Sequence, residues 1–413
     1  MMSTTKLSFA ELLASLEVAV RDGNLARARE LERIIQQRLV IEAAERTDME
    51  RQVRALMAEL EKPATQPSVL TFDPRDLQRS STPETEPLVY PVWFGTNRKM
   101  MTGEPGFTAE RSDRMTCGRA EVYIPDAHRF GETGTSFWTR LLRFDLRDDS
   151  LRLQHVTIQD QNAFLSDIRS VVQAVIQDGE EPHALLFLHG YNVTFEDAAI
   201  RAAQIGYDLK VTGPTAFFSW PSRGRVAGYP SDEAAIEASE GAITNFLVDF
   251  AANCGAKKVH VIAHSMGNRG LLRALQRIAA NAETRGKVKF AQIFLAAPDV
   301  DRDLFLDLAY LYGEHAARTT LYASGADLAV HLSSRVHAAP RAGYFTPYTV
   351  AAGLDTVAVP NFDVDLLGHS YYAEAEALLY DIHALMRKDC DPAQRQRIEA
   401  IHLEGEKFWK LRR

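Results

Sequence analysis

The chain lacks the features that would place it in a membrane or in a disulfide-linked secreted fold. No apolar run approaches the roughly 18 to 20 residues that cross a bilayer. The first residues carry no apolar stretch of the kind found in a secretory signal. Only three cysteines occur, Cys117, Cys254 and Cys390, and they form neither a CxxC pair nor an obvious disulfide framework. We therefore expect a cytoplasmic protein with no transmembrane segment.

An excess of positive charge is also absent. The chain has 47 Lys and Arg against 55 Asp and Glu, a net charge of −8. Binding to nucleic acid without sequence preference needs clustered positive charge, so we predict no nucleic-acid partner. The hydrophobic share of 46% and the charged share of 25% are ordinary for a globular protein. A length of 413 residues suits one large domain with appendages.

The N-terminal segment has the pattern of amphipathic helices. Ser8 to Glu11 and Thr47 to Glu50 are capping boxes, in which a side chain at each end satisfies a backbone N–H of the other. We expect a helical hairpin over residues 1–62 that packs on the main domain, on a second subunit or on a protein partner. Five prolines follow, and they predict an extended linker over residues 63–87.

From residue 88 to residue 388, short apolar runs alternate with helical patterns. Buried parallel strands read as continuous apolar runs, with crossover helices between them, so we predict an α/β domain with a mostly parallel sheet flanked by helices. The expected strands are Leu88–Phe94, Ala120–Ile124, Ala184–Leu188, Ala216–Trp220, Lys258–Ala263, Phe290–Ala296, Thr319–Ala323 and Asp355–Val359, and the expected helices are Ala163–Val175, Phe195–Leu209, Ala234–Ala252, Gly267–Ala280 and Tyr371–Arg387. Asp391 before Pro392 is typical of a helix start, so we expect a C-terminal helical tail over residues 389–413.

A serine lies between one of these strands and one of these helices. Ser265 is flanked by Ala263 and Gly267 in the spacing small-x-Ser-x-Gly. This is the nucleophile-elbow pattern, in which a tight turn lifts the serine hydroxyl above the sheet edge. The backbone N–H of Met266 would lie at the helix N-terminus, where an anion is stabilised. We predict Ser265 as nucleophile and Met266 N–H as an oxyanion donor, although a serine in such a turn can also be incidental.

A second loop points to the same chemistry. His189, Gly190, Tyr191 and Asn192 directly follow the expected strand Ala184–Leu188. In α/β hydrolases a loop after an early strand supplies the other oxyanion donor. We predict that donor to be the backbone N–H of Tyr191, with Asn192 as the second choice. We interpret His189 as structural support for the loop and not as a base.

The acid and the base of a triad should follow the nucleophile along the chain in this fold. Asp327 comes after an expected strand and is our candidate acid. Asp299, which comes after the preceding strand, is the alternative, and either aspartate could instead cap a helix. His369, between the last expected strand and helix, is our candidate base. No metal-binding spacing and no phosphate- or dinucleotide-binding glycine loop is evident, so we expect no metal and no cofactor.

These residues predict acyl transfer through a Ser-His-Asp triad and an acyl-enzyme. The substrate would be a small acyl compound, and a carboxylic ester is our first interpretation. Amide or thioester hydrolysis uses the same residues and stays open. A non-catalytic scaffold protein on the same fold is the alternative of a different class.

Several short segments together resemble the esterase/lipase-like bacterial α/β-hydrolase family of unknown function. The segments are Phe94–Arg98, His189–Asn192, Phe218–Ser222, Ala263–Gly267, Ala297–Asp299 and Gly368–Tyr371. The resemblance covers roughly residues 88–388. It implies the α/β-hydrolase fold and a triad of Ser265, Asp327 and His369, but it implies no particular substrate.

Overall fold

The structure, a computed structural model, divides the chain into two compact units, Met1–Glu84 and Thr85–Arg413. It describes residue 31 and residues 88–103, 106–125, 151–224, 228–323, 339–344, 349–359, 372–403 and 405–412. The expected hairpin over residues 1–62 and the linker over residues 63–87 lie outside the described residues, except that Leu31 is a buried helical residue.

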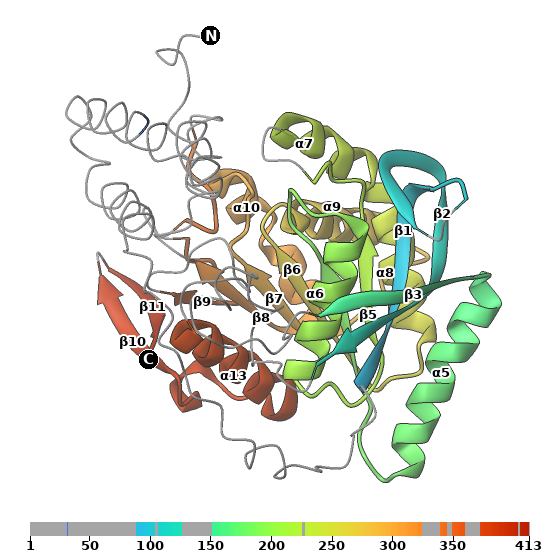
Figure 1. Cartoon of the computed structure of the whole chain (residues 1–413). Helices are drawn as coiled ribbons and strands as arrows, with labels where there is room; N and C mark the ends of the chain where they lie inside the picture. The colour runs from blue at the N-terminus through green and yellow to red at the C-terminus, as the bar shows by residue number, and fades with distance from the viewer. Residues whose placement is uncertain are drawn as a thin grey trace, which may run out of the picture. The chain divides into compact units, whose positions relative to one another are not determined.

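A single sheet of eleven strands forms the centre of the second unit, in the order β10-β11-β9-β8-β7-β6-β4-β5-β1-β2-β3 (Figure 1). Strands β2 and β10 run antiparallel to their neighbours, and the other pairs are parallel. The strands are β1 (Leu88–Met100), β2 (Phe107–Ile124), β3 (Arg152–Gln159), β4 (His183–Leu188), β5 (Thr215–Ser219), β6 (Lys258–His264), β7 (Phe290–Ala296), β8 (Ala316–Ala323), β9 (Leu354–Ala358), β10 (Ile398–Leu403) and β11 (Glu406–Leu411). A mostly parallel sheet is therefore confirmed.

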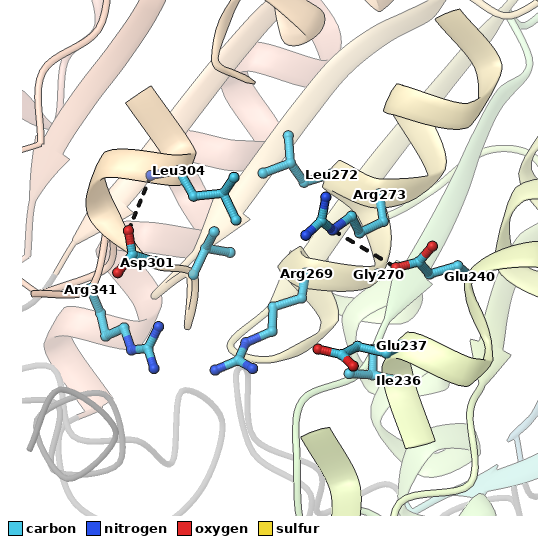
Figure 2. Close-up of a pocket in the computed structure, with 11 residues that line it drawn as sticks. Ile236, Glu237, Glu240, Arg269, Gly270, Leu272, Arg273, Asp301, Leu304 and Arg341 are labelled. Carbon is cyan, nitrogen blue, oxygen red and sulfur yellow. Dashed lines mark hydrogen bonds and ion pairs between the residues drawn. The ribbon is translucent and has the colours of Figure 1, made fainter. Parts of the chain in front are cut away.

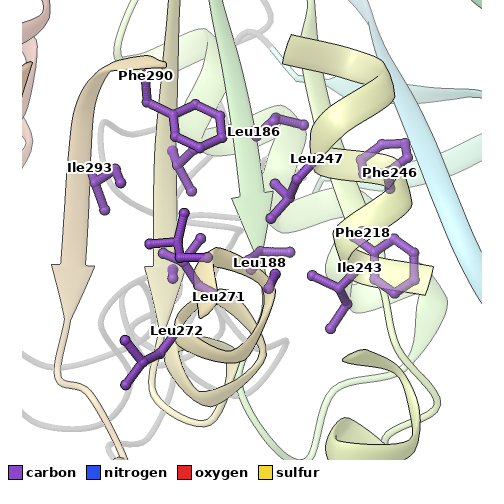
Figure 3. Close-up of a cluster of buried hydrophobic side chains, with 14 of the residues drawn as sticks. Leu186, Leu188, Phe218, Ile243, Phe246, Leu247, Leu271, Leu272, Phe290 and Ile293 are labelled. Carbon is purple, nitrogen blue, oxygen red and sulfur yellow. The ribbon is translucent and has the colours of Figure 1, made fainter. Parts of the chain in front are cut away.

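Helices cover both faces of the sheet, which explains why the central strands are apolar on both sides. The helices are α5 (Gln161–Gln177), α6 (Phe195–Asp208), α7 (Tyr229–Ala238), α8 (Glu240–Asn253), α9 (Gly267–Ala280), α10 (Arg302–Leu308), α11 (Tyr310–His315), α13 (Tyr372–Lys388) and the short 3₁₀ helix η4 (Pro392–Gln394). One buried cluster joins the sheet to α5 and to α7 through α11, and Figure 3 shows its centre around Leu188, Phe246 and Leu271. A second cluster joins the other face to α6 and α13.

The order in which successive strands are added to the sheet reverses at β4. This strand lies between β5, which follows it in the chain, and β6, which comes after β5. The two connections therefore leave β4 in opposite directions. In open α/β sheets such a switch point opens a crevice at the carboxyl ends of the strands, and ligands bind there. The two loops singled out from the sequence, His189–Asn192 and Ser265–Gly267, begin at the carboxyl ends of β4 and β6.

The expected C-terminal helical tail is wrong. Asp391 does precede a helical turn, but η4 is only three residues long. The chain then forms the antiparallel hairpin β10–β11, whose two-residue connection ends at Gly405 with φ +84°. Strand β11 pairs in parallel with β9, for example Trp409 beside Val357, so the tail extends the sheet.

A buried guanidinium ties this tail to the domain. The Arg395 side chain is fully buried, and its Nε donates to Asp381 Oδ1 of α13 at 3.0 Å. The hydroxyl of Tyr322 on β8 donates to Asp381 Oδ2 at 2.8 Å. Arg395 Nη1 also lies 3.5 Å from Asp355 Oδ2 on β9. A buried charge is tolerated only when it is paired in this way, so the tail, β8, β9 and α13 form one unit.

Candidate active site

Ser265 occupies a sharp, strained turn between β6 and α9. Its φ is +48°, a conformation that few residues other than glycine adopt. The turn is held on one side by the Ser265 N–H, which donates to Ala296 O at 2.9 Å, and on the other by the Asp299 N–H, which donates to Ser265 O at 3.1 Å. A non-glycine residue keeps such a conformation only where its surroundings impose it. This is the nucleophile-elbow geometry.

The side chain of Asn268 fixes this turn from below. Its Nδ2 donates to Ala263 O and to Ser265 O, both at 3.0 Å, and lies 3.3 Å from Ala296 O. Asn268 is fully buried in the first turn of α9. Asn268 was not predicted from the sequence. A side-chain amide on the otherwise apolar inner face of a helix indicates such a role, because a buried amide must find hydrogen-bond partners.

Glycine is required where the two loops meet. A Cβ added to Gly267 would lie 2.6 Å from both the Leu188 and the His189 carbonyl oxygens. A Cβ added to Gly190 would lie 3.1 Å from the Cβ of Ser265 and 2.8 Å from Nδ1 of His264. The loop after β4 therefore packs directly on the turn that carries Ser265.

The predicted oxyanion donors differ in their surroundings. Among the described residues, no acceptor receives the Met266 N–H, which lies at the start of the 14-residue helix α9. The Asn192 N–H donates to Asp232 Oδ2 at 3.1 Å, so our second choice of donor has another partner. Asp232 is fully buried and also accepts from the Arg223 N–H at 2.7 Å. Asp232, which was not predicted as a site residue, ties the loop after β4 to the loop after β5.

His189 is buried beside Gly190 and does not face solvent. Its Nδ1 lies 2.8 Å from Gly190 O, and its Nε2 lies 3.3 Å from Ser219 Oγ. The ring stacks on Trp220 with a centroid distance of 5.0 Å. Burial lowers the pKa of His189 to about 3, and the positive charge of Arg98 contributes in the same direction. A neutral, packed imidazole fits the interpretation of His189 as support for the loop.

Two further histidines, the buried His260 and the partly buried His264, also have lowered pKa values. Burial lowers the pKa of His260 to about 3, and its Nε2 lies 3.0 Å from Nδ1 of His183. Burial, followed by the charge of Arg201, lowers the pKa of His264 to about 4. In the unfolded chain these imidazoles bind a proton near pH 6.5, so between about pH 6.5 and pH 4 the unfolded state holds more protons than the folded state.

The stability of the domain should therefore be greatest above pH 6.5 and fall as the pH drops. For each of His189, His260 and His264, the free energy of unfolding falls by up to about 1.4 kcal/mol for every pH unit below about 6.5. Urea unfolding at a series of pH values from 7.5 to 5 measures this slope. His260→Asn should lower the slope by about 1.4 kcal/mol per pH unit, whereas Gln154→Asn, at an exposed position, should leave it unchanged. A flat stability over this range would contradict the assignment of neutral buried imidazoles.

Asp299, the alternative acid, is engaged by other groups. Its Oδ2 accepts from the Tyr229 hydroxyl at 2.6 Å. Its Oδ1 lies 3.4 Å from Arg269 Nη2 and 3.4 Å from Arg341 Nε. Arg269 Nε also donates to the Asp299 carbonyl at 2.6 Å. The carboxylate is thus the centre of a buried ion cluster beside the elbow.

Asp327 and His369 lie outside the described residues. The strands and the helix around them are described: β8 ends at Ala323, β9 ends at Ala358 and α13 begins at Tyr372. Strands β6, β7, β8 and β9 are successive parallel neighbours, so their carboxyl ends lie along one edge of the sheet.

A cavity of about 130 Å³ lies against the outer side of α9. Figure 2 shows Arg269, Arg273 and Arg341 around it, with the Arg273–Glu240 ion pair drawn across one wall. Each guanidinium has a carboxylate partner: Asp299 for Arg269 and Arg341, and Glu240 at 3.8 Å for Arg273. The cavity is therefore balanced in charge, and Ser265 does not line it.

Two kinds of feature are absent from the part of the chain that the structure describes. There, no cluster of three or more His, Cys, Asp or Glu side chains has the arrangement of a metal site. In the same ranges, no helix combines the length and the apolar character needed to cross a membrane.

Comparison with known proteins identifies the family. A family model described as "Alpha/beta hydrolase of unknown function (DUF900)" matches residues 166–388, more than half of the chain. The chain belongs to this family. The match includes the elbow and the loop after β4, so the α/β-hydrolase fold is confirmed, as is the resemblance found in the sequence.

Three individual matches have low sequence identity to this chain. The uncharacterized protein alr1448 of Nostoc sp. strain PCC 7120 is 26% identical, with 31% of this chain and 48% of the relative covered. The chain thus spans about half the length of this curated relative. A crystal structure of an uncharacterized Bacillus cereus protein is 14% identical, with 51% of this chain and 61% of that chain covered and a TM-score of 0.33. A structure from Agrobacterium vitis S4, described as a "putative hydrolase", is 12% identical, with 68% and 98% covered and a TM-score of 0.34.

Proposed function

We propose that this member of the family is a serine hydrolase that cleaves carboxylic esters of small molecules. The observation that carries the proposal is the backbone of Ser265, which holds φ +48° at the carboxyl end of β6 and directly before helix α9. Strain of this kind is retained where the fold imposes it, and functional sites are common among such places. The same turn in α/β hydrolases presents the nucleophile.

In the proposed mechanism, His369 takes the proton of Ser265 Oγ while that oxygen attacks the carbonyl carbon of the ester. Asp327 holds the imidazole in the correct tautomer and stabilises its protonated form. The backbone N–H groups of Met266 and Tyr191 bind the oxyanion of the tetrahedral intermediate, and each such donor is typically worth about 10²- to 10³-fold in rate. The alcohol leaves with a proton from His369, and water activated by the same imidazole then hydrolyses the acyl-enzyme.

The positions of the strands support this choice of acid and base. Asp327 follows the end of β8 by four residues, and His369 precedes the start of α13 by three residues. Strand β8 is two places from β6, a separation of about 10 Å. Four residues of extended chain span up to about 14 Å, so a side chain at position 327 is within reach of the elbow.

A fluorophosphonate probe tests the proposal, because it phosphonylates an activated serine. The full-length wild-type protein should be labelled, and Ser265→Ala should abolish labelling while the far-ultraviolet circular dichroism and the melting temperature stay close to wild type. Ser170→Ala, at an exposed position on α5, is the matched control and should be labelled as wild type is.

A folded wild-type protein that the probe does not label would overturn the proposal and favour a scaffold protein on a hydrolase fold. If labelling depends on Ser265, matched p-nitrophenyl ester, thioester and anilide substrates with one acyl group separate the remaining possibilities. Ester turnover should be the fastest of the three. Faster turnover of the thioester or the anilide would show that the enzyme's preferred bond is that one and not the ester.

A further inference from the structure

We propose that Arg98, Ser219 and His189 form a hydrogen-bonded relay that orients the Gly190–Tyr191 peptide as an oxyanion donor. The relay connects three segments that are remote in the sequence: Arg98 lies on β1, Ser219 is the last residue of β5 and His189 follows β4. It rests on the proposed function, because it assigns these side chains a positioning role in the same site. None of the three would touch the reacting atoms.

The relay begins at a buried guanidinium. Arg98, at 1% exposure, lies near the carboxyl end of β1. Its Nε donates to Ser219 Oγ at 2.9 Å, its Nη1 to Ser222 O at 3.0 Å and its Nη2 to Val193 O at 2.8 Å. An arginine can only donate. Ser219 Oγ therefore accepts from Arg98, and its own hydroxyl proton remains available for another acceptor.

That acceptor is Nε2 of His189, 3.3 Å from Ser219 Oγ. On the other side of the ring, Nδ1 lies 2.8 Å from Gly190 O, which can only accept. Nδ1 must therefore carry the proton, and Nε2 must receive the one from Ser219. These two contacts favour the neutral tautomer with the proton on Nδ1. Stacking on Trp220, whose Nε1 donates to His189 O at 3.0 Å, holds the ring in plane.

The end of the relay acts on a peptide bond. The Gly190 carbonyl and the Tyr191 N–H belong to one planar trans peptide, in which the two groups point in opposite directions. A hydrogen bond that fixes the carbonyl oxygen therefore fixes the direction of the N–H. Gly190 itself packs on the Cβ of Ser265, so this peptide lies beside the proposed nucleophile. The relay holds the donor in place before substrate arrives, which is how oxyanion donors act most effectively.

A pair of variants at position 189 separates the effect of losing the hydrogen-bond donor from the effect of changing the packing. Asparagine can place an N–H where Nδ1 lies, whereas leucine has nearly the same volume and no donor. With a p-nitrophenyl ester and the full-length protein, we expect His189→Leu to lower kcat by about 10²-fold with KM within about threefold of wild type. His189→Asn should retain kcat within about tenfold of wild type. Ser219→Ala, which breaks the relay at its middle, should lower kcat by about tenfold.

A transition-state analogue gives a readout that a purely structural role would not change. An aryl trifluoromethyl ketone forms a hemiketal oxyanion, so its Ki should rise across these variants in proportion to the loss of kcat/KM. The control is Thr356→Ala, which removes a buried hydroxyl that donates to Thr349 O at 2.7 Å. It should lower the melting temperature as Ser219→Ala does and leave kcat and Ki unchanged.

Imidazole ¹⁵N resonances of the wild type report the relay without any turnover. We expect a neutral His189 with its proton on Nδ1, and loss of the Nε2 hydrogen bond in Ser219→Ala. A proton on Nε2, or equal kcat in the leucine and asparagine variants, would overturn the relay even in an active enzyme. A folded protein that no fluorophosphonate labels would overturn the proposed function and the positioning role, while the Nδ1 proton would still be observed.

Discussion

Replacing Asp327 with asparagine is expected to lower kcat by about 10⁴-fold, the loss typical of a triad whose histidine is left in the wrong tautomer. Replacing Asp299 with asparagine should have a much smaller effect on kcat. Asp299 already accepts from Tyr229 and pairs with Arg269 and Arg341. A histidine would have to displace one of these partners to use it as the acid.

The Asp299 variant should instead lose stability, by about 3 to 5 kcal/mol, because the buried arginines lose their shared carboxylate. Steady-state kinetics and urea unfolding of the two variants, measured together, separate the two roles. If Asp299→Asn were folded and inactive while Asp327→Asn kept wild-type activity, the acid would be Asp299.

The Gly267→Ala variant is expected to be labelled by a fluorophosphonate about 10²- to 10³-fold more slowly than wild type. The added methyl group would meet the Leu188 and His189 carbonyl oxygens at 2.6 Å. Both are backbone atoms, so no rotamer change relieves the clash. The loop after β4 must move away from the elbow, which separates the two proposed oxyanion donors. Overpacking of this kind also costs about 1 to 3 kcal/mol of stability.

Gly313→Ala is the matched control for that substitution. Gly313 lies within α11, and no atom within 4 Å meets a Cβ added there. Alanine should stabilise this helix by up to about 1 kcal/mol and leave labelling unchanged. A Gly267→Ala protein with the wild-type labelling rate would show that the two loops need not be in contact for reactivity.

The sequence was most informative where burial is complete. Strands β4 and β5 are buried along their whole length, so their residues form apolar runs that can be recognised. Strand β3 was missed because it lies at a sheet edge, where exposed residues such as Arg152 and His155 interrupt the run. The expected helix Ala234–Ala252 is instead two helices, α7 and α8, which meet at Ser239.

The C-terminal hairpin could not be read from local pattern alone. The Asp391-Pro392 signal describes the first turn correctly. The chain then forms a hairpin whose second strand, β11, pairs with the edge of β9, and the paired residues Trp409 and Val357 are 52 positions apart in the chain. The two-residue connection ending in Gly405 is a hairpin signal that went unused. Tertiary pairing decided the outcome here, as it often does for strands.

In the site, short sequence motifs were enough to predict Ser265, Gly267 and the loop of His189. Each of these motifs lies within a few residues of a strand end. The residues that were missed, Asn268 and Asp232, serve carbonyl and amide groups from several segments at once. The role of these two side chains depends on which loops the sheet brings together. No short segment of a single sequence contains that information.

The buried pair of Arg395 and Asp381 has a consequence for how the domain tolerates truncation. Asp381 lies buried in α13, and the guanidinium that pairs with it comes from residue 395, beyond the end of that helix. A chain cut between α13 and residue 395 would bury this carboxylate without its cation, a loss that typically costs about 3 to 5 kcal/mol. The same cut would remove β11 and so leave one edge of β9 without its partner strand.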